Sequence, residues 1–169
     1  MLIENLVSNG NECTFDLLLR DNERIENIRQ ALYNDAVMIA ADKLLIYDNN
    51  TSLNSEALGS IFANTPFPQT LVRWNLDEYV TDQPKVVTTN DLISDEYEQY
   101  PLSTIVIARL GIDDRIHLQI TTKEGTSKEH NKFAAVRDFR WSQVSSNMYK
   151  CKLQTMDHIE AASIISQFE

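Results

Sequence analysis

The sequence predicts an α+β protein, and two patterns support this class. Segments of alternating polarity, typical of strands, dominate the middle of the chain, while apolar residues at helical spacing lie near both ends. The chain has 169 residues, 43% of them hydrophobic, which is enough for one domain or two small lobes with a core. We expect a discontinuous lobe of residues 1–46 and 145–169, with a β-rich lobe of residues 47–144 inserted into it.

The first strand and the first helix are predicted near the N-terminus. Residues 11–20 alternate between apolar and polar or mixed positions, which is typical of a strand. A helix over about residues 23–35 follows, with Asp21 or Asn22 as its cap. Its apolar residues recur every three or four positions and predict one buried face, made of Ile25, Ile28, Ala31, Leu32 and Ala36.

The next third of the chain begins with extended structure over residues 37–47. Asn54 or Ser55 is expected to open a second helix over residues 56–63, which ends before a Thr-Pro pair because the residue before a proline avoids helical geometry. Residues 67–100 contain prolines and an acidic cluster, and they predict short strands and surface loops.

The second half of the chain is predominantly extended. Four strands are predicted, over residues 103–110, 115–122, 133–139 and 148–154. A polar loop over residues 123–132 joins the second of these strands to the third. A final helix over residues 158–168, capped by Asp157, has an apolar side formed by Ile159, Ala162 and Ile165.

Charge and cysteine content exclude several classes of function. The formal net charge is −10, so the chain is a poor stand-alone binder of a phosphate backbone, and we expect no direct DNA contact. The two cysteines lie far apart without a CxxC motif, which argues against a thiolate zinc or iron–sulfur site and favours a reduced, intracellular protein. No apolar run is long enough to span a bilayer, and the N-terminus has no basic segment typical of a signal peptide.

Catalytic motifs are absent from the sequence. The histidines, His117, His130 and His158, form no HExxH or HxH arrangement, and no GxGxxG, GxxxxGK[ST] or GxSxG occurs. Cys13 paired with a histidine is a possible nucleophile, but its place in an alternating strand favours a buried core thiol. We therefore expect no cofactor and no metal.

The most polar loop stands out from this background. Residues 123–136, KEGTSKEHNKFAAV, carry three lysines, two glutamates and a histidine, and contain the aromatic Phe133. Two interpretations are open: a solvated hairpin, or a charged docking surface suited to salt bridges and hydrogen bonds with a partner.

This segment resembles the motif K-x-G-x-(G/A)-K-E-H-A-K-W, followed by a Val/Ala-rich strand, of the RNA polymerase D family of alpha-like subunits. That family contains the archaeal alpha-like subunit and the third-largest subunit of eukaryotic RNA polymerase II, and it is the counterpart of the bacterial alpha N-terminal domain. Lys128, Glu129, His130 and Lys132 match the motif, and Phe133 replaces the tryptophan.

Three further segments are similar to the family in the same order. Counting on from Arg29 without a gap places Asp35, Ala40 and Asp42 at positions where the family has an acidic residue, an alanine and an aspartate. The segment NNTSLNSEALGSIFANTP resembles the next element of the family, and YKCKLQTMDHIEAASIISQF resembles its C-terminal strand and helix. Departures include Gln30, Val37, Ser60 and Ile61, where the family has Arg, Pro and a His-Arg pair, and an insert without cysteines.

The resemblance implies an alpha-subunit-like dimerisation lobe, made of a sheet plus two helices, with an inserted β-rich lobe. It also implies a non-catalytic assembly-platform subunit of a multisubunit DNA-directed RNA polymerase. Such a subunit pairs with a smaller alpha-like subunit and docks the large catalytic subunits, especially the second largest. The site of action would be that of transcription, in the nucleus or the cytoplasm, and the chain's size and asparagine content suggest a viral or plasmid-borne polymerase.

The resemblance also assigns residues to the two kinds of contact. The partner-binding residues would be Arg29, Glu56, Lys128, Glu129, His130, Lys132 and Phe133, with the loop forming a second docking point on the inserted lobe. The dimerisation residues would be Ile25, Ile28, Leu32, Ile159, Ala162 and Ile165.

Two other function classes remain. One is an unrelated soluble protein-binding adaptor, in which the polar loop is simply a loop. The other is an enzyme that uses Glu129 and His130 as an acid–base pair, which is disfavoured because no nucleophile or metal-ligand set accompanies them.

Overall fold

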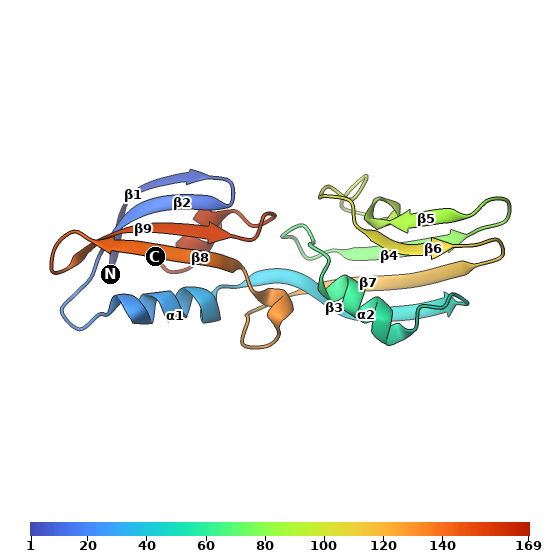
Figure 1. The fold of residues 1–169 in the computed structure, drawn as a ribbon, viewed down its shortest axis with the longest axis horizontal. Coiled ribbons are helices and arrows are strands. Elements are labelled where there is room, and N and C mark those ends of the chain that lie inside the picture. Colours follow the sequence, from blue (N-terminus) through green and yellow to red (C-terminus); the bar gives the residue numbers. More distant parts are fainter. The chain divides into compact units, whose positions relative to one another are not determined.

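The computed structural model describes residues 1–169 and confirms the α+β class, with nine strands in antiparallel sheets and three α-helices (Figure 1). The chain forms two compact units. The terminal unit contains residues 1–38 and 124–169, and the inserted unit contains residues 39–123. The boundaries between the units therefore lie at 38/39 and 123/124, and not at 46/47 and 144/145 as expected. Residues 39–46 belong to the inserted unit, and residues 124–144 belong to the terminal unit.

The terminal unit is built on a four-stranded sheet in the order β1-β2-β9-β8, which joins the two ends of the chain. Its strands are β1 (Leu2–Asn9), β2 (Glu12–Leu18), β8 (Val136–Gln143) and β9 (Met148–Thr155). Cys13 lies opposite Leu153, and Phe15 lies opposite Cys151, so that these buried side chains share one face.

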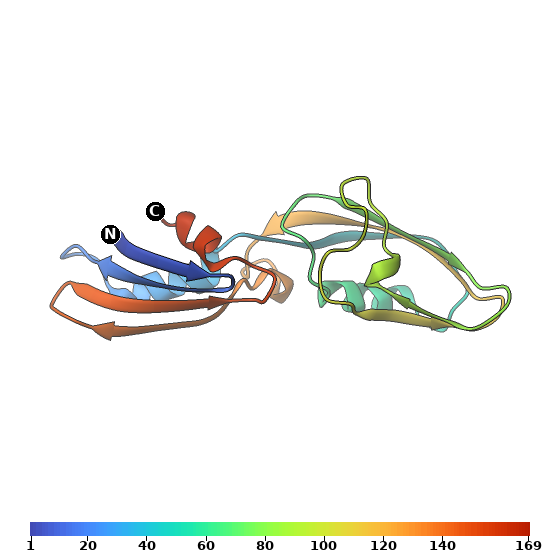
Figure 2. The same cartoon turned by 90° about the horizontal axis from the view of Figure 1, so that it is seen from above.

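Helices α1 (Ile25–Asp35) and α3 (Ala161–Ser166) pack on this buried face of the sheet (Figures 1 and 2). From α1, Leu32 enters the core, and from α3, Ile164 and Ile165 do so. The predicted cap of α1 is wrong: the helix begins after Arg24 without a side-chain cap, while the neighbouring Glu23 binds the N-terminal ammonium at 2.9 Å.

The last helix is shorter than the predicted residues 158–168. The buried Thr155 hydroxyl donates a 2.6 Å hydrogen bond to the Ile159 carbonyl, which holds residues 156–160 in a turn, so that α3 begins only at Ala161. Asp157 does not cap the helix but forms an ion pair of 2.9 Å with Arg137. The end of the helix is fixed by Gln167, whose side-chain amide makes hydrogen bonds of 2.8 and 2.9 Å with both backbone groups of Val37.

The inserted unit has its own core between a three-stranded sheet, β3-β7-β4, a two-stranded sheet, β5-β6, and one helix. The elements are β3 (Met38–Asn49), α2 (Ser55–Ala63), β4 (Arg73–Tyr79), β5 (Lys85–Thr88), β6 (Val106–Leu110) and β7 (Arg115–Gly125). The predicted core face of β7 is confirmed, because Ile116, Leu118 and Ile120 are fully buried. The Asn54 cap is also confirmed, since its side chain accepts the Ala57 N–H at 2.8 Å.

His158 supplies a test of packing in the terminal unit. Burial lowers the pKa of this half-buried histidine below its usual value of about 6.5, because its Nε2 atom is enclosed without a hydrogen-bond partner. The folded chain favours the neutral form of His158, so protonation of this side chain favours unfolding. The contribution of the neutral side chain to the free energy of unfolding is complete above about pH 6.5, and it is lost as the pH falls through the lower pKa of the folded state.

We expect the free energy of unfolding, measured by urea titration, to fall more steeply between pH 7 and pH 5 in the wild type than in His158→Gln. Identical pH profiles for the two proteins would contradict the argument.

Candidate partner-docking surface

Helix α1 presents Arg29 and Tyr33 as neighbours four residues apart. The Arg29 guanidinium carbon lies 5.5 Å from the centre of the Tyr33 ring, which is the geometry of a cation–π contact. The Tyr33 hydroxyl accepts a 3.1 Å hydrogen bond from the Phe139 N–H of β8. Because that bond fixes the ring to the sheet, the cation–π contact restricts the orientation of the exposed Arg29 side chain.

The polar loop folds back onto the C-terminal end of α1. Lys128 Nζ lies 2.7 Å from Asp35 Oδ1, and the Ser127 hydroxyl donates a 2.7 Å hydrogen bond to the Tyr33 carbonyl. That carbonyl is one of the last four of the helix, which find no partner within the helix itself. The loop therefore acts as a C-terminal cap for α1, with the Lys128 and Asp35 side chains 64% and 50% exposed.

Inside the loop, a short 3₁₀ turn over Asn131–Phe133 sets the direction of the chain into β8. His130 Nδ1 accepts the Lys132 N–H at 3.0 Å, so one ring nitrogen is engaged in capping this turn. The Phe133 ring is buried, and the Lys132 ammonium lies 5.3 Å from its centre. The strand predicted at residues 133–139 therefore begins later, at Val136.

Gly125 explains how the Phe133 ring is seated. A Cβ atom built at Gly125 would lie 2.8 Å from three carbons of that ring, which is closer than real contacts allow. The ring occupies the space that a side chain at position 125 would need. Phe133 is thus an anchor of the loop and offers little surface to a partner.

These contacts bring together two regions that the sequence placed on different lobes. The loop was expected on the inserted lobe, but residues 124–132 belong to the terminal unit together with Arg29. We call the combined set of residues the α1–loop surface; it consists of Arg29, Tyr33, Asp35, Ser127, Lys128, Glu129, His130 and Lys132. It mixes both signs of charge on a framework fixed by hydrogen bonds, which suits recognition of a protein partner.

The other predicted site residues have different environments. Glu56 lies exposed in the first turn of α2, in the inserted unit. Of the expected dimerisation residues, Leu32, Ile159 and Ile165 are buried within the terminal unit itself. Ile25, Ile28 and Ala162 are half-buried and retain surface that a partner could cover.

Tyr33 and Ser127 were not among the predicted site residues. Tyr33 had a usable signal, because it follows Arg29 by four positions and residues at that spacing meet on a helix. Ser127 had none, since only the folded chain shows which helix end the loop reaches.

Reactive thiols and metal-binding clusters do not add a second candidate site. Burial raises the pKa of the Cys13 thiol to about 11 and that of Cys151 to about 12, so neither is a ready nucleophile. No group of three or more His, Cys, Asp or Glu side chains is placed to hold a metal ion. None of the helices is long and apolar enough to cross a membrane.

No protein-family model matches the chain, and a search of curated proteins found no significant match.

The close packing of the Phe133 ring against Gly125 gives a first test of this surface. We expect Gly125→Ala to destabilise the chain by about 1–3 kcal/mol, because the added methyl group forces the buried ring to move. Gly59→Ala is the matched control, since a Cβ there meets nothing within 4 Å in the middle of α2. It should stabilise the chain by about 0.5–1 kcal/mol.

Thermal and urea unfolding of the three proteins would measure both effects. Equal stability of the wild type and Gly125→Ala would show that the ring is not seated as described.

Proposed function

We propose that this protein is a non-catalytic assembly-platform subunit of a multisubunit DNA-directed RNA polymerase. The observation that carries the proposal is the α1–loop surface: the two regions that resemble the RNA polymerase D family, helix α1 with Arg29 and the loop with Lys128–Lys132, lie in one compact unit. They are linked by one hydrogen bond, from Ser127 to Tyr33, and one ion pair, between Lys128 and Asp35. A solvated hairpin would need no such link to the end of a helix.

The order of elements along the chain supports the same proposal. A β-hairpin and a helix come first, the inserted unit follows, and a second hairpin and helix complete the terminal unit. This arrangement agrees with an alpha-subunit-like dimerisation lobe of a sheet plus two helices. In such a lobe the smaller alpha-like subunit would cover the half-buried Ile25, Ile28 and Ala162.

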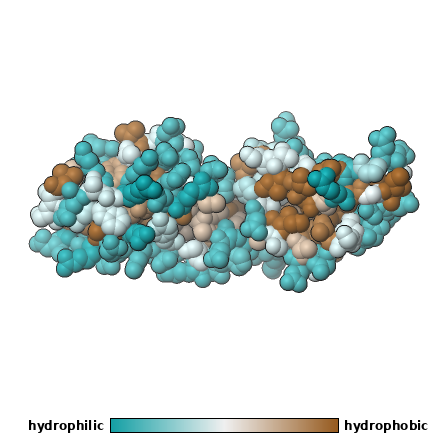
Figure 3. Space-filling model, viewed as in Figure 1, coloured by the Kyte–Doolittle hydropathy of each residue, from teal (hydrophilic) through white to brown (hydrophobic).

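The α1–loop surface would dock the second-largest subunit. The Arg29 guanidinium is exposed and lies 5.5 Å from the centre of the Tyr33 ring, and its N–H groups can donate paired hydrogen bonds to a carboxylate. Lys128 is already oriented by Asp35, so it loses less freedom on binding. Further partner contacts are expected on the inserted unit, where exposed apolar side chains gather on the face seen in Figure 3.

A protein-binding adaptor is the second candidate, and one observation favours it. Leu32, Ile159 and Ile165 are buried by the chain itself, so the terminal unit has a core without a partner. An adaptor of this kind is expected to be a well-folded monomer.

A tagged pull-down from the native source, analysed by native mass spectrometry, separates the two functions. Recovery with two very large polymerase subunits and a small alpha-like chain would establish the platform. Recovery alone or with unrelated proteins would favour the adaptor.

Within such a complex, we expect Arg29→Glu to weaken recruitment of the large subunit roughly tenfold or more, because it places a carboxylate where a carboxylate partner binds. The heterodimer with the small subunit should persist. Arg24→Glu, an exposed change of equal charge at the other end of α1, is the control and should have little effect. If the Arg29 variant retains the large subunit as tightly as the wild type does, the role given to Arg29 is wrong.

A further inference from the structure

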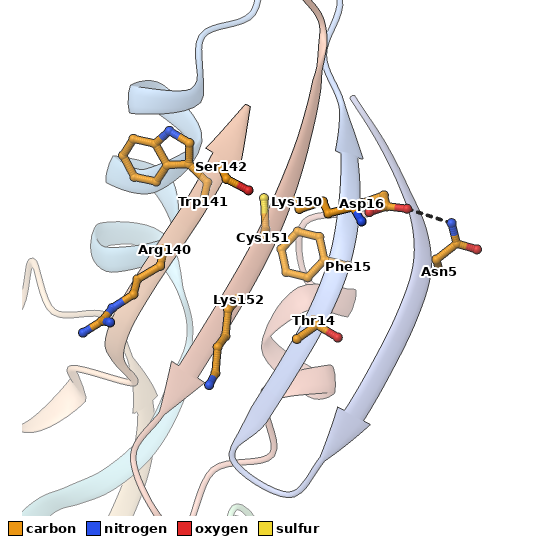
Figure 4. Close-up of a pocket in the computed structure, with 10 residues that line it drawn as sticks. All are labelled: Asn5, Thr14, Phe15, Asp16, Arg140, Trp141, Ser142, Lys150, Cys151 and Lys152. Carbon is orange, nitrogen blue, oxygen red and sulfur yellow. Dashed lines mark hydrogen bonds between the residues drawn. The ribbon is translucent and has the colours of Figure 1, made fainter. Parts of the chain in front are cut away.

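The second face of the terminal unit's sheet has no helix on it. Figure 4 views this open face, with the helices behind the strands. Two depressions, with volumes of about 450 and 170 Å³, lie along it. We define the open face by the side chains of β2, β8 and β9 that the strand register places around these depressions, which are Glu12, Thr14, Asp16, Asp138, Arg140, Ser142, Lys150, Lys152 and Gln154. Glu4 and Val7 of the edge strand β1 lie on the same side of the sheet, opposite Asp16 and Thr14.

Three cations occupy the centre of the open face, although the chain as a whole carries a net charge of −10. Lys150 and Lys152 lie on β9, and Arg140 lies on the edge strand β8 directly opposite Lys152. Like charges at directly opposed positions of an antiparallel pair destabilise a sheet. The fold alone therefore gives no reason for a second cation beside Arg140.

Two of the three cations, Lys150 and Lys152, are only weakly neutralised by the chain itself. Lys152 Nζ is 3.9 Å from the nearest Glu12 oxygen, and Lys150 forms no ion pair although Asp16 lies opposite it. Arg140 binds Asp138 through Nε at 2.7 Å, while its side chain is 80% exposed. Its two terminal nitrogens thus remain available to donate to an anion, and the Thr14 and Ser142 hydroxyls line the same depression.

The spacing of the lysines indicates the shape of a ligand. Lys150 and Lys152 are two residues apart on one strand, which separates them by about 6.7 Å along the strand. An extended peptide with an acidic residue at every second position repeats its carboxylates at the same interval. The carboxylates surround the three neighbouring cations: Asp16 lies opposite Lys150, and Glu12 and Asp138 lie opposite Gln154. A continuous phosphate backbone that runs beyond the cations would be repelled by these carboxylates more than a short peptide with separate charges.

We propose that the open face is a docking site for an extended acidic segment of a protein partner, held by Lys150, Lys152 and Arg140. The proposal is independent of the polymerase function, because it uses the face of the sheet opposite the helices and none of the residues of the α1–loop surface.

The test is NMR titration of the ¹⁵N-labelled full chain with an eight-residue peptide of alternating threonine and glutamate. Saturable amide shifts are expected in β8 and β9, and a peptide with glutamine in place of glutamate should cause none. The Lys150→Thr/Lys152→Thr variant should lose these shifts. Its unfolding temperature should change little, because loss of the like-charge neighbour of Arg140 offsets loss of the opposite-charge neighbour of Asp16.

The matched control is Arg20→Thr/Arg24→Thr, which removes two exposed positive charges of the terminal unit outside the open face. Both this control and Arg29→Glu should retain the shifts, so that failure of the polymerase proposal is separable from failure of this one. The proposal is overturned if the peptide causes no saturable shifts, if they map elsewhere, or if the control loses them equally. It is also overturned if an eight-nucleotide oligothymidylate causes the same shifts at lower concentration.

Discussion

The terminal unit depends on the pairing of β2 with β9. Seven residue pairs, from Glu12 with Gln154 to Leu18 with Met148, join a hairpin from the start of the chain to one from its end. This ladder forms the middle of the sheet, aligns the buried faces under α1 and α3, and leaves the open face on the other side. Because the paired segments are separated by the whole inserted unit, their contact carries a large loop-closure entropy that local structure cannot offset.

The elements that the sequence predicts well have a strong local period. Helix α1, helix α2 and strand β7 each carry apolar residues at regular spacing, and the structure places all three near their predicted bounds, although α1 fully buries only Leu32 of its predicted face. Strand β1 carried no such signal, since nearly every residue in it is exposed at the sheet edge. Helix α3 was predicted too long because the bond from Thr155 to the Ile159 carbonyl competes with helix formation, and periodicity does not contain that information.

The sequence predicted some residues of the candidate site and not the way they assemble. The charge and composition of the loop singled it out, and the resemblance pointed to Lys128, Glu129, His130 and Lys132 within it, but neither indicated the unit to which they belong. That assignment depends on Gly125, where a missing side chain admits the Phe133 ring, and on Ser127, which reaches a helix carbonyl 94 positions away. Contacts of this range arise from tertiary packing, and neither spacing nor propensity encodes them.

The hydrogen bonds between the Gln167 side chain and Val37 couple the C-terminal helix to the α1–loop surface. Its amide ties the residue after α3 to Val37, which is two positions beyond Asp35 and its bond to Lys128. The last turn of the chain and the α1–loop surface therefore share one backbone segment. Any partner that orders α3 also restricts that segment, and a ligand on the α1–loop surface restricts it from the other side. The coupling free energy is the same in both directions, so occupancy at either place raises affinity at the other.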